Sequence, residues 1–386
     1  NTESLPLLIA DGDNFLDVHK QVLMKIYTQG LTEEHGDKQK GSARSAVMLA
    51  IYRNAAKALA SLSAIYKQGE RSTEEIREAY KAQLLRFDHD GDYSYGERTR
   101  VFFGFDQLPK TALVLKNNPT RAAIIQRFDP VEDMRSYTDP DTGKTKYTHD
   151  PCLTHDIFFL QNGHLHSFHI ARAHNTVNAY PENIFGLHDA YICTVREKLG
   201  AKPGDMYMLS SRANILLLTE EQRSKKLMSE PSKPMDEIDS KSGPYQLAEN
   251  TKFPLANETG VAYSFVPLQK IASRPNNFIL DRLENMEGVN TIEKAIFYLK
   301  EKGVMHNNPI LTEYKAGKMD PQGDYLAFFQ ANVMGGKVHA TAVFMNHSIS
   351  KQKEDLELLN YISTKFSETL GYPLGNLSLF YVAFTQ

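Results

Sequence analysis

Cys152 and Arg172 are the side chains whose types and positions most directly suggest chemistry. Cys152 follows a proline and precedes a strand predicted over residues 154–163, and Arg172 ends the next predicted strand, residues 163–172. An Asn-Gly pair joins the two strands and is typical of a hairpin. A cysteine becomes a nucleophile when nearby positive charge lowers its pKa. The pattern indicates a thiol with an electrostatic partner; the alternative is a buried thiol and a solvent-facing charge.

Asn183 is the next candidate, in the first turn of a helix that Pro181 opens. Its amide offers a donor and an acceptor, which suits the O4 and N3–H edge of a uracil. The alternative is an amide that caps or solvates the start of the helix.

Several histidines cluster in the same stretch, namely His155, His164, His166, His169 and His174. Along the strand His164 and His166 share one face while His169 lies on the other, and no acidic residue stands at ligand spacing. The sequence therefore predicts no metal site here.

The totals describe an ordinary globular chain of 386 residues, 41% hydrophobic and 24% charged, which favours two domains or one large α/β domain. A net charge of -3 gives no bulk attraction to nucleic acid or to acidic membranes. Two cysteines exclude a disulfide framework and favour a reducing compartment, the cytoplasm. No apolar run reaches the roughly 18 residues of a membrane span.

Periodicity and end signals define the elements that must position these residues. Helices are predicted over residues 14–29, 44–67, 72–87, 106–118 and 181–199, and a further strand over residues 120–130. Ser72 and Glu75 form a capping box, and Gly200 ends the last of these helices. Residues 220–262 are rich in charge, serine and proline and are predicted to be a connecting loop.

The C-terminal third repeats the pattern of the middle third in the same order. Residues 290–310 echo 105–124, residues 320–348 echo 150–175, and residues 356–380 echo 184–209. The echoes favour an internal duplication of a helix-strand-strand-strand-helix-strand unit, although helix and strand periods can also match by chance. In the second copy Gln322 stands for Cys152 and Met345 for Arg172.

We therefore predict an α/β (α+β) fold, with a mixed sheet packed by helices in each of two tandem copies that form an intrachain pseudo-dimer. Residues 1–235 would form a domain that carries the active site, and residues 271–386 would form a degenerate second repeat. Residues 236–270 would connect the two.

A set of ordered motifs resembles the thymidylate synthase and pyrimidine nucleotide hydroxymethylase superfamily. These motifs are YGER from Tyr95, FDQL from Phe105, NNPTR ending at Arg121, PC ending at Cys152, RAHN from Arg172, PENI around Asn183, GD ending at Asp205 and SEP from Ser229. The spacings from Cys152 to Arg172 and from Arg172 to Asn183 match the family without gaps. The resemblance covers roughly residues 93–234.

The resemblance implies a role for each matching residue. Cys152 would add to C6 of a pyrimidine and make C5 a carbon nucleophile. Arg172 would hold the nucleotide phosphate and favour the thiolate, Asn183 would select uracil over cytosine, and Tyr95 would assist proton transfer at C5. 5,10-Methylenetetrahydrofolate would supply one carbon, and hydride or water would then give a methyl or hydroxymethyl group.

The chain departs from the family at several contacts. Ala173 replaces a serine, Asn175 replaces the aspartate that contacts folate, Asn214 and Leu216 replace the histidine and tyrosine that hold the sugar, and Leu62 lies nearest the place of a catalytic glutamate. The chain has no tryptophan, so the tryptophans of the folate pocket are absent. Loss of charge-assisted contacts worth about 1–3 kcal/mol each would weaken binding of dUMP.

Arginines of this family cross to the phosphate site of the partner subunit. If the second repeat acts as the partner, the counterpart of Arg121 is Leu311, so the Cys152 site receives no crossing arginine and Arg121 points at the second copy instead. Other arginines, Arg44, Arg98 and Arg100, are then candidates for the phosphate. Arg121, Arg98 and Asn214 remain candidate substrate contacts, and Asn175 a candidate cofactor contact.

The leading prediction is a transferase of nucleotide biosynthesis or pyrimidine modification that methylates or hydroxymethylates C5 of a uracil nucleotide or a modified relative. One alternative is a catalytically inactive nucleotide-binding or scaffold homologue. Another is C5 modification that starts from the same thiolate but needs no folate. Whether the pseudo-dimer forms a further homo-oligomer is left open.

Overall fold

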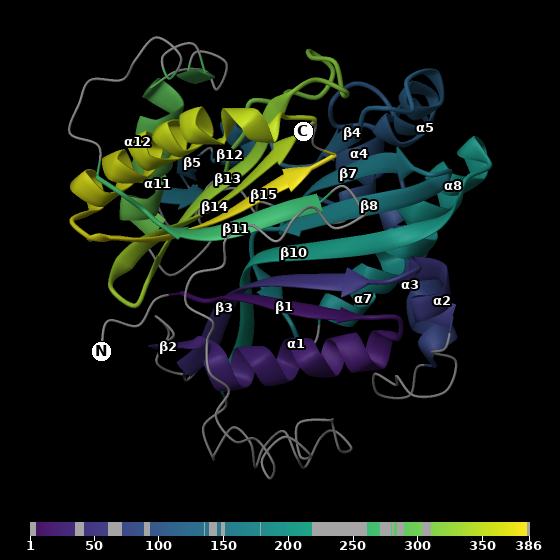
Figure 1. Cartoon of the computed structure of the whole chain (residues 1–386), viewed down its shortest axis with the longest axis horizontal. Helices are drawn as coiled ribbons and strands as arrows, with labels where there is room; N and C mark the ends of the chain where they lie inside the picture. Colours follow the sequence, from purple (N-terminus) through teal and green to yellow (C-terminus); the bar gives the residue numbers. More distant parts are fainter. Residues whose placement is uncertain are drawn as a thin grey trace.

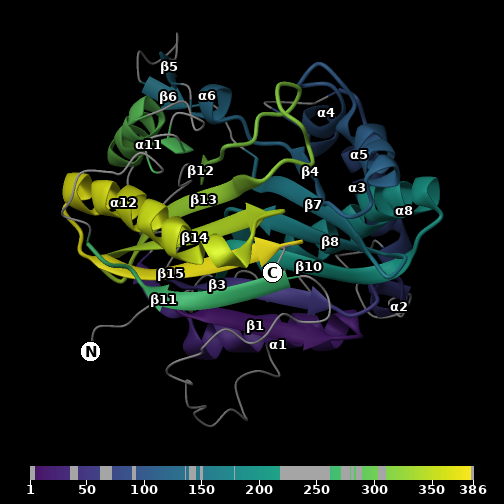
Figure 2. The ribbon, with the colours of Figure 1, turned by 45° about the horizontal axis from the view of Figure 1, so that its top comes forward.

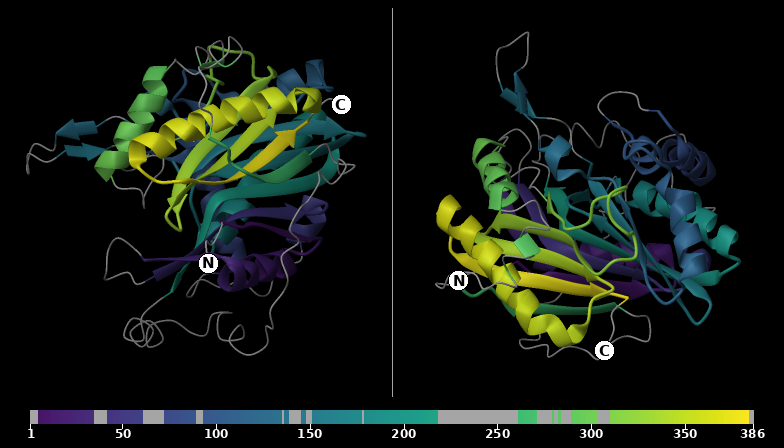
Figure 3. Two further views of the ribbon diagram at one scale, coloured as in Figure 1. Left: turned by 60° about the vertical axis from the view of Figure 1, so that its left-hand side comes forward. Right: turned by 90° about the horizontal axis from the view of Figure 1, so that it is seen from above.

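Two β-sheets lie face to face at the centre of the protein, and helices cover the outer face of each (Figures 1 and 3). The computed structural model describes residues 5–34, 42–60, 72–88, 93–134, 136–138, 145–147, 151–177, 179–217, 261–270, 279, 282–283, 289–302 and 310–383. The order of layers is therefore helices, sheet, sheet and helices, which is the mixed α/β class predicted from the sequence.

The first sheet has eight strands in the order β1-β3-β10-β8-β7-β4, with β2 beside β3 and β9 beside β10. Its strands are β1 (Leu7–Gly12), β2 (Leu31–Glu34), β3 (Ser42–Tyr52), β4 (Ala123–Gln126), β7 (Leu153–Gln161), β8 (His164–Ala171), β9 (His174–Asn175) and β10 (Lys202–Leu217). A short hairpin of β5 (Ser136–Thr138) and β6 (Thr145–Tyr147) projects from the body (Figure 2).

Helices of the first half pack on the outer face of this sheet. They are α1 (Phe15–Gln29), α2 (Ala55–Ala60), α3 (Thr73–Leu85), α4 (Tyr95–Arg100), α5 (Gln107–Asn117), α7 (Ala179–Gly186), the π-helix η2 (Leu187–Ile192) and α8 (Cys193–Leu199). The short helix α6 (Pro130–Asp133) instead follows β4 and precedes the β5–β6 hairpin. The Asn14 side chain caps α1, and the predicted capping box of Ser72 and Glu75 starts α3. The predicted helices over residues 14–29, 72–87 and 106–118 are confirmed with ends within two residues, and Gly200 follows α8 in the left-handed conformation. The helix predicted to open at Pro181 instead begins at Ala179.

The second sheet has five strands in the order β11-β15-β14-β13-β12. Its elements are β11 (Val261–Pro267), α11 (Val289–Lys302), β12 (Ile310–Leu311), β13 (Tyr325–Met334), β14 (Lys337–Met345), the short helix η4 (Ile349–Lys351), α12 (Gln352–Leu370) and β15 (Leu374–Val382). Its inner face packs on the first sheet through a shared apolar core that includes Ile157, Phe168, Phe328 and Phe380. Its outer face is covered by α11 and α12.

The two sheets repeat one pattern of strand order and direction. From β4 to β3 in the first sheet and from β12 to β11 in the second, the neighbours pair antiparallel, antiparallel, parallel and antiparallel. Helix α5 precedes β4 as α11 precedes β12, and helices join β8 to β10 as α12 joins β14 to β15. This agreement supports the internal duplication, which stays a prediction.

A local detail recurs in both sheets. The backbone N–H of Asp205 donates to Nδ1 of His166 over 3.1 Å, and the N–H of Asn376 donates to Nδ1 of His339 over 3.1 Å. In each case a glycine precedes the donor, and a Cβ on that glycine would meet the same histidine ring. The two histidines also occupy matching places in the sequence echoes.

The predicted helix over residues 44–67 is wrong for its first part. Residues 42–52 form β3, and only Ala55–Ala60 are helical, while residues 61–71 lie outside the described residues. β3 is buried on both faces, with Ala46, Met48, Ala50 and Tyr52 toward the helices and Val47, Leu49 and Ile51 toward the second sheet. A strand buried on both faces has a continuous apolar run, which also satisfies a helical spacing.

Two further stretches differ from the expectations. β1 occupies a segment for which no regular element was predicted, and it pairs in parallel with β3. β11 lies inside the predicted connecting segment and pairs with β15, whereas the rest of the predicted loop, residues 220–260, lies outside the described residues. Among the described residues no helix is both long and apolar enough to cross a membrane.

Candidate active site

The hairpin of β7 and β8 brings Cys152 and Arg172 together. Asn162 and Gly163 both have positive φ angles, 51° and 76°, as the tight turn requires, and the register runs from Gln161↔His164 to Leu153↔Ala171. Cys152 and Arg172 are the next residues beyond that last pair. The Arg172 N–H donates to the Cys152 carbonyl over 2.9 Å, so the two backbones are adjacent, while the predicted pairing of guanidinium and thiol stays a prediction.

Arg172 is held firmly in place at this position. Its Nε donates to the Pro151 carbonyl over 2.9 Å, and the residue is only 1% exposed. Cys152 itself is partly exposed. Cys152 is therefore a partly exposed residue, and the carbonyl of the preceding Pro151 binds the buried guanidinium of Arg172.

Tyr95, at the first turn of α4, belongs to the same neighbourhood. Burial raises the pKa of the Tyr95 phenol well above its usual value, and electrostatic interactions with Tyr93, Cys152 and Tyr80 add to the rise. The phenol is therefore protonated at neutral pH. It can donate a hydrogen bond or pass on a proton, but it is not a base.

Asn183 is buried in α7, 4% exposed, and is oriented by two partners. The Tyr80 hydroxyl donates to its Oδ1, and its Nδ2 lies 2.9 Å from Nε2 of His174. Burial lowers the pKa of His174 to about 3, so the ring is neutral and its Nε2 accepts from the amide while its Nδ1 donates to Ser210. An amide has capacity for further hydrogen bonds, so Asn183 is positioned without being saturated.

Tyr80 contacts the Asn183 amide in the neighbourhood of Cys152, and the sequence did not identify it as a site residue. Its phenol interacts electrostatically with Tyr95, which in turn interacts with Cys152. The available signal was the spacing of Ile76, Tyr80 and Leu84, which puts Tyr80 on the buried face of α3. A buried tyrosine hydroxyl usually finds a partner.

The hydrogen bonds of Arg98 and Arg121 are made to residues outside the group of Cys152, Tyr95 and Asn183. Arg98 is buried and pairs with Asp133 through Nη2 and Nη1 at 2.7 and 3.2 Å, so its guanidinium is already bound by a carboxylate. The Nε of Arg121 donates to the carbonyl of Gln322 over 2.7 Å, and the Gln322 amide donates back to the Arg121 carbonyl over 3.1 Å. Arg121 thus contacts the residue that stands for Cys152 in the second copy, as the crossing arrangement implies.

The remaining candidate arginines are also engaged within the protein. Arg100 pairs with Asp106, and Arg44 donates to the Gly30 carbonyl over 2.8 Å. Neither is brought to Cys152 by any of these contacts.

Asn175 and Asn214 lie side by side, since β9 pairs with β10 in the register Asn214↔Asn175. The Oδ1 of Asn175 accepts from the Val177 N–H over 3.1 Å, and the Asn214 carbonyl accepts from Thr176. Both asparagines are partly exposed. Their role in binding sugar or cofactor stays a prediction.

The histidines of this stretch do not converge on one point. His169 lies between Asp156 and Ser167 at 2.7 and 3.0 Å, deep in the core, and Asp156 also binds Arg127. His166 stacks on Phe159 with ring centroids 5.3 Å apart. These contacts are structural.

Comparison with known proteins finds relatives that match only part of the chain. No protein-family model matches the sequence. A protein named "Putative thymidylate synthase" from Methanosarcina barkeri is 33% identical over 147 residues, which are 37% of this chain and 62% of that protein. One of the same name from Methanothermobacter thermautotrophicus is 32% identical over 141 residues, 36% of this chain and 58% of that protein. The chain thus spans about three fifths of the length of these curated relatives.

Solved structures overlap only loosely. The thymidylate synthase from T4 phage has a TM-score of 0.29 and 19% identity, covering 54% of this chain and 58% of that chain. Thymidylate synthase A from Bacillus subtilis has a TM-score of 0.37 and 18% identity, covering 51% of this chain and 78% of that chain. Structural similarity this low does not show where any residue of the site lies.

The fold is a mixed α/β fold with two helix-covered sheets, and the site is a cysteine beside an arginine at paired strand ends. The curated relatives support assignment of the chain to a thymidylate-synthase-like superfamily.

Proposed function

We propose that the protein transfers a one-carbon group to C5 of the pyrimidine of a nucleotide, with Cys152 as the covalent nucleophile. The observation that carries the proposal is the grouping of four predicted residues. The backbones of Cys152 and Arg172 pair at the strand ends, the buried Tyr95 phenol interacts electrostatically with Cys152 and Tyr80, and the Tyr80 hydroxyl donates to Asn183.

The reaction begins at the sulfur. The Cys152 thiolate adds to C6 of the ring, and the electron pair of the C5–C6 double bond moves to C5 and the O4 carbonyl. C5 then attacks a one-carbon electrophile. Water takes the C5 proton, and expulsion of the thiolate then restores the ring double bond and frees the enzyme.

The neighbouring residues have distinct tasks in this scheme. Arg172 stabilises the negative charge of the thiolate before the addition and after its expulsion. Asn183, oriented by Tyr80 and His174, donates to or accepts from the O4 and N3–H edge of the base. The protonated Tyr95 donates a hydrogen bond near C5 and orients the water that takes the C5 proton, because the phenol itself is not a base.

Methylenetetrahydrofolate as the carbon donor rests on the resemblance alone. At the position where the family has a folate-contacting carboxylate, Asn175 presents an uncharged amide whose oxygen already accepts from the Val177 N–H at 3.1 Å. The residues present therefore do not fit that contact, and no step is derived through a folate. A donor without folate would suit the altered residue, which favours the folate-independent alternative for the same Cys152 chemistry.

An inactive nucleotide-binding homologue is the second candidate, and the burial of Arg172 favours it. The guanidinium is 1% exposed and one of its nitrogens already binds the Pro151 carbonyl. A phosphate could reach it only from within the protein. In that case the thiol would not turn over substrate, although a base could still contact Asn183.

Exchange of the C5 hydrogen separates these candidates without knowledge of the donor. Reversible addition of a thiolate at C6 makes C5 basic, so a nucleotide tritiated at C5 loses its label to water. We expect tritium release from dUMP, UMP or dCMP by the wild-type protein, none by Cys152→Ala, and retained release by the matched control Cys193→Ala. Equal release by Cys152→Ala would refute the proposal, and no release by the wild type from any of the three would favour the inactive homologue.

A further inference from the structure

The second cysteine, Cys193, stands at an irregularity in the long helix that runs from α7 to α8. Residues 187–192 form the π-helix η2, and the Cys193 N–H donates to the carbonyl of His188, five residues earlier. Residues five apart point to different sides of an α-helix, but the wider π turn brings them to the same side. π-Helical turns inside α-helices are frequent at functional sites.

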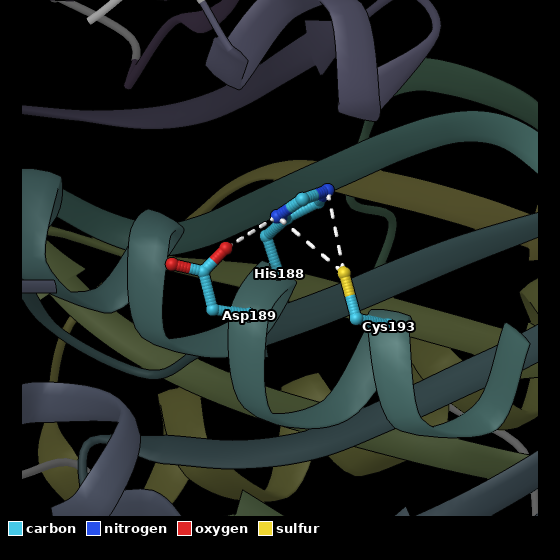
Figure 4. A group of neighbouring side chains, drawn as sticks. All are labelled: His188, Asp189 and Cys193. Carbon is cyan, nitrogen blue, oxygen red and sulfur yellow. Dashed lines mark hydrogen bonds and ion pairs between the residues drawn. The ribbon is translucent and has the colours of Figure 1, made fainter. Parts of the chain in front are cut away.

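The irregularity places the Cys193 sulfur beside an imidazole. Sγ lies 4.0 Å from Nδ1 and 4.0 Å from Nε2 of His188, as Figure 4 shows. Cys193 is partly exposed, and His188 is 7% exposed. The sulfur therefore lies against the imidazole of a buried histidine, in a residue that is itself partly exposed.

A carboxylate and a guanidinium hold the imidazole in place. Nδ1 of His188 lies 2.7 Å from Oδ1 of Asp189, and Arg77 of α3 binds both oxygens of that carboxylate through Nε and Nη2 at 2.7 Å each. The remaining guanidinium nitrogen of Arg77, Nη1, donates to the Leu59 carbonyl over 2.9 Å. Because Arg77 takes both oxygens and adds positive charge, the group is poorly suited to hold a metal ion, although its atoms lie within 4.8 Å of one another.

The charges of the group agree with a protonated imidazole. Burial lowers the pKa of His188, but the hydrogen bonds to Asp189 and Cys193 outweigh it and the net shift is upward. Burial raises the pKa of Asp189, but His188 and Arg77 bring it down to about 2. Among the described residues, the other charged groups that interact with the cluster are Arg77 and Glu74, both from α3.

We propose that Cys193 is a second reactive thiol, held beside the His188 imidazolium as a thiolate, and that its reaction partner is a hydroperoxide. The sulfur attacks the terminal oxygen of the peroxide, the O–O bond breaks, and the departing oxygen takes the imidazolium proton. Hydrogen peroxide thus gives one sulfenic acid and one water, with sulfur oxidised by two electrons. A small uncharged oxidant suits a sulfur that is only partly exposed.

Two site-resolved measurements on the full chain test this. The first is the rate of alkylation of Cys193 by iodoacetamide from pH 5 to pH 10, read by mass spectrometry of its peptide. We expect an inflection well below the value of about 8.5 of a free thiol, and a rate at pH 6.5 reduced on the order of tenfold in His188→Gln. His164→Gln, a partly exposed histidine outside the cluster, is the matched control.

The second measurement is dimedone labelling after one equivalent of hydrogen peroxide, where we expect the label on Cys193 and its loss in His188→Gln. Each variant is checked for a wild-type circular dichroism spectrum. If His188→Gln fails this check, the wild-type pH profile decides alone. An inflection near 8.5, or equal alkylation rates in wild type and a folded His188→Gln, would overturn the proposal, whatever the outcome for Cys152.

Discussion

Replacing His155 with leucine is expected to stabilise the protein, and to do so more in acid than at neutral pH. His155 lies on β7, is 0% exposed, and its ring stands edge-on to Phe328 of the second sheet with centroids 6.4 Å apart. Within the described part of the chain neither ring nitrogen has a hydrogen-bond partner. A buried polar group without a partner costs about 1–3 kcal/mol, and leucine of similar size removes that cost at any pH.

The pH-dependent part follows from linkage. Burial, with a contribution from Arg127, lowers the pKa of His155 to about 3, whereas the unfolded ring has a pKa of about 6.5. As the pH falls below 6.5 the unfolded chain binds a proton that the native protein does not, so stability is lost at up to about 1.4 kcal/mol per pH unit. Between pH 7.5 and pH 5 this amounts to about 2 kcal/mol for one such histidine.

Urea unfolding of wild type and His155→Leu at pH 7.5 and pH 5 measures the difference. The gain in the free energy of unfolding should be larger at pH 5 by about 2 kcal/mol. His164→Leu replaces a partly exposed histidine of the neighbouring strand and controls for the loss of an ionisable side chain. A gain that is the same at both pH values, or a loss at both, would show that His155 is not a neutral ring buried between the sheets.

Three further predictions concern the site and the second copy. Tyr80→Phe removes the donor to Asn183, which should destabilise the protein by about 1–2 kcal/mol in urea unfolding and slow tritium release; unchanged release would show that Tyr80 does not position the amide. Arg121→Met removes the bond to the Gln322 carbonyl and should lower the free energy of unfolding by about 1 kcal/mol, without abolishing tritium release; complete loss of release would place Arg121 at the working site. His347 has a pKa raised to about 9, since its bonds to Asp324 and Asp355 outweigh burial. The stabilisation that protonated His347 contributes is complete below pH 6.5 and is lost as the pH rises through 9. His347→Gln should therefore flatten the decline of the thermal unfolding temperature at alkaline pH. An unaltered decline would contradict the raised pKa of His347.

Local signals made the hairpin and the helix ends predictable. Asn162-Gly163 fixes the turn between β7 and β8, and the turn fixes the register that pairs Cys152 with Arg172. The capping box and the helix-ending glycine likewise made the start of α3 and the end of α8 predictable, because their hydrogen bonds involve residues close in sequence.

Contacts between residues far apart in the sequence could not be predicted from such local signals. Tyr80 and Asn183 are separated by 103 positions, and no spacing rule links them. The apolar run of β3 satisfies helical and strand periods equally, because both of its faces are buried. The π-helical turn at Leu187–Ile192 has no marker in the sequence, so the meeting of His188 and Cys193 could be seen only in the structure.

The most direct test of the central claim is covalent trapping of the Cys152 sulfur. The protein is incubated with a 5-fluoropyrimidine nucleotide together with a one-carbon donor, formaldehyde or 5,10-methylenetetrahydrofolate. After C5 has bonded to the donor carbon, the C5 fluorine cannot leave as a proton would, so the bond between sulfur and C6 persists, and the peptides are then analysed by mass spectrometry. One nucleotide is expected on the peptide that contains Cys152, and no adduct is expected in Cys152→Ala. An unmodified Cys152 peptide in the wild type, or a nucleotide attached to Cys193 instead, would contradict it.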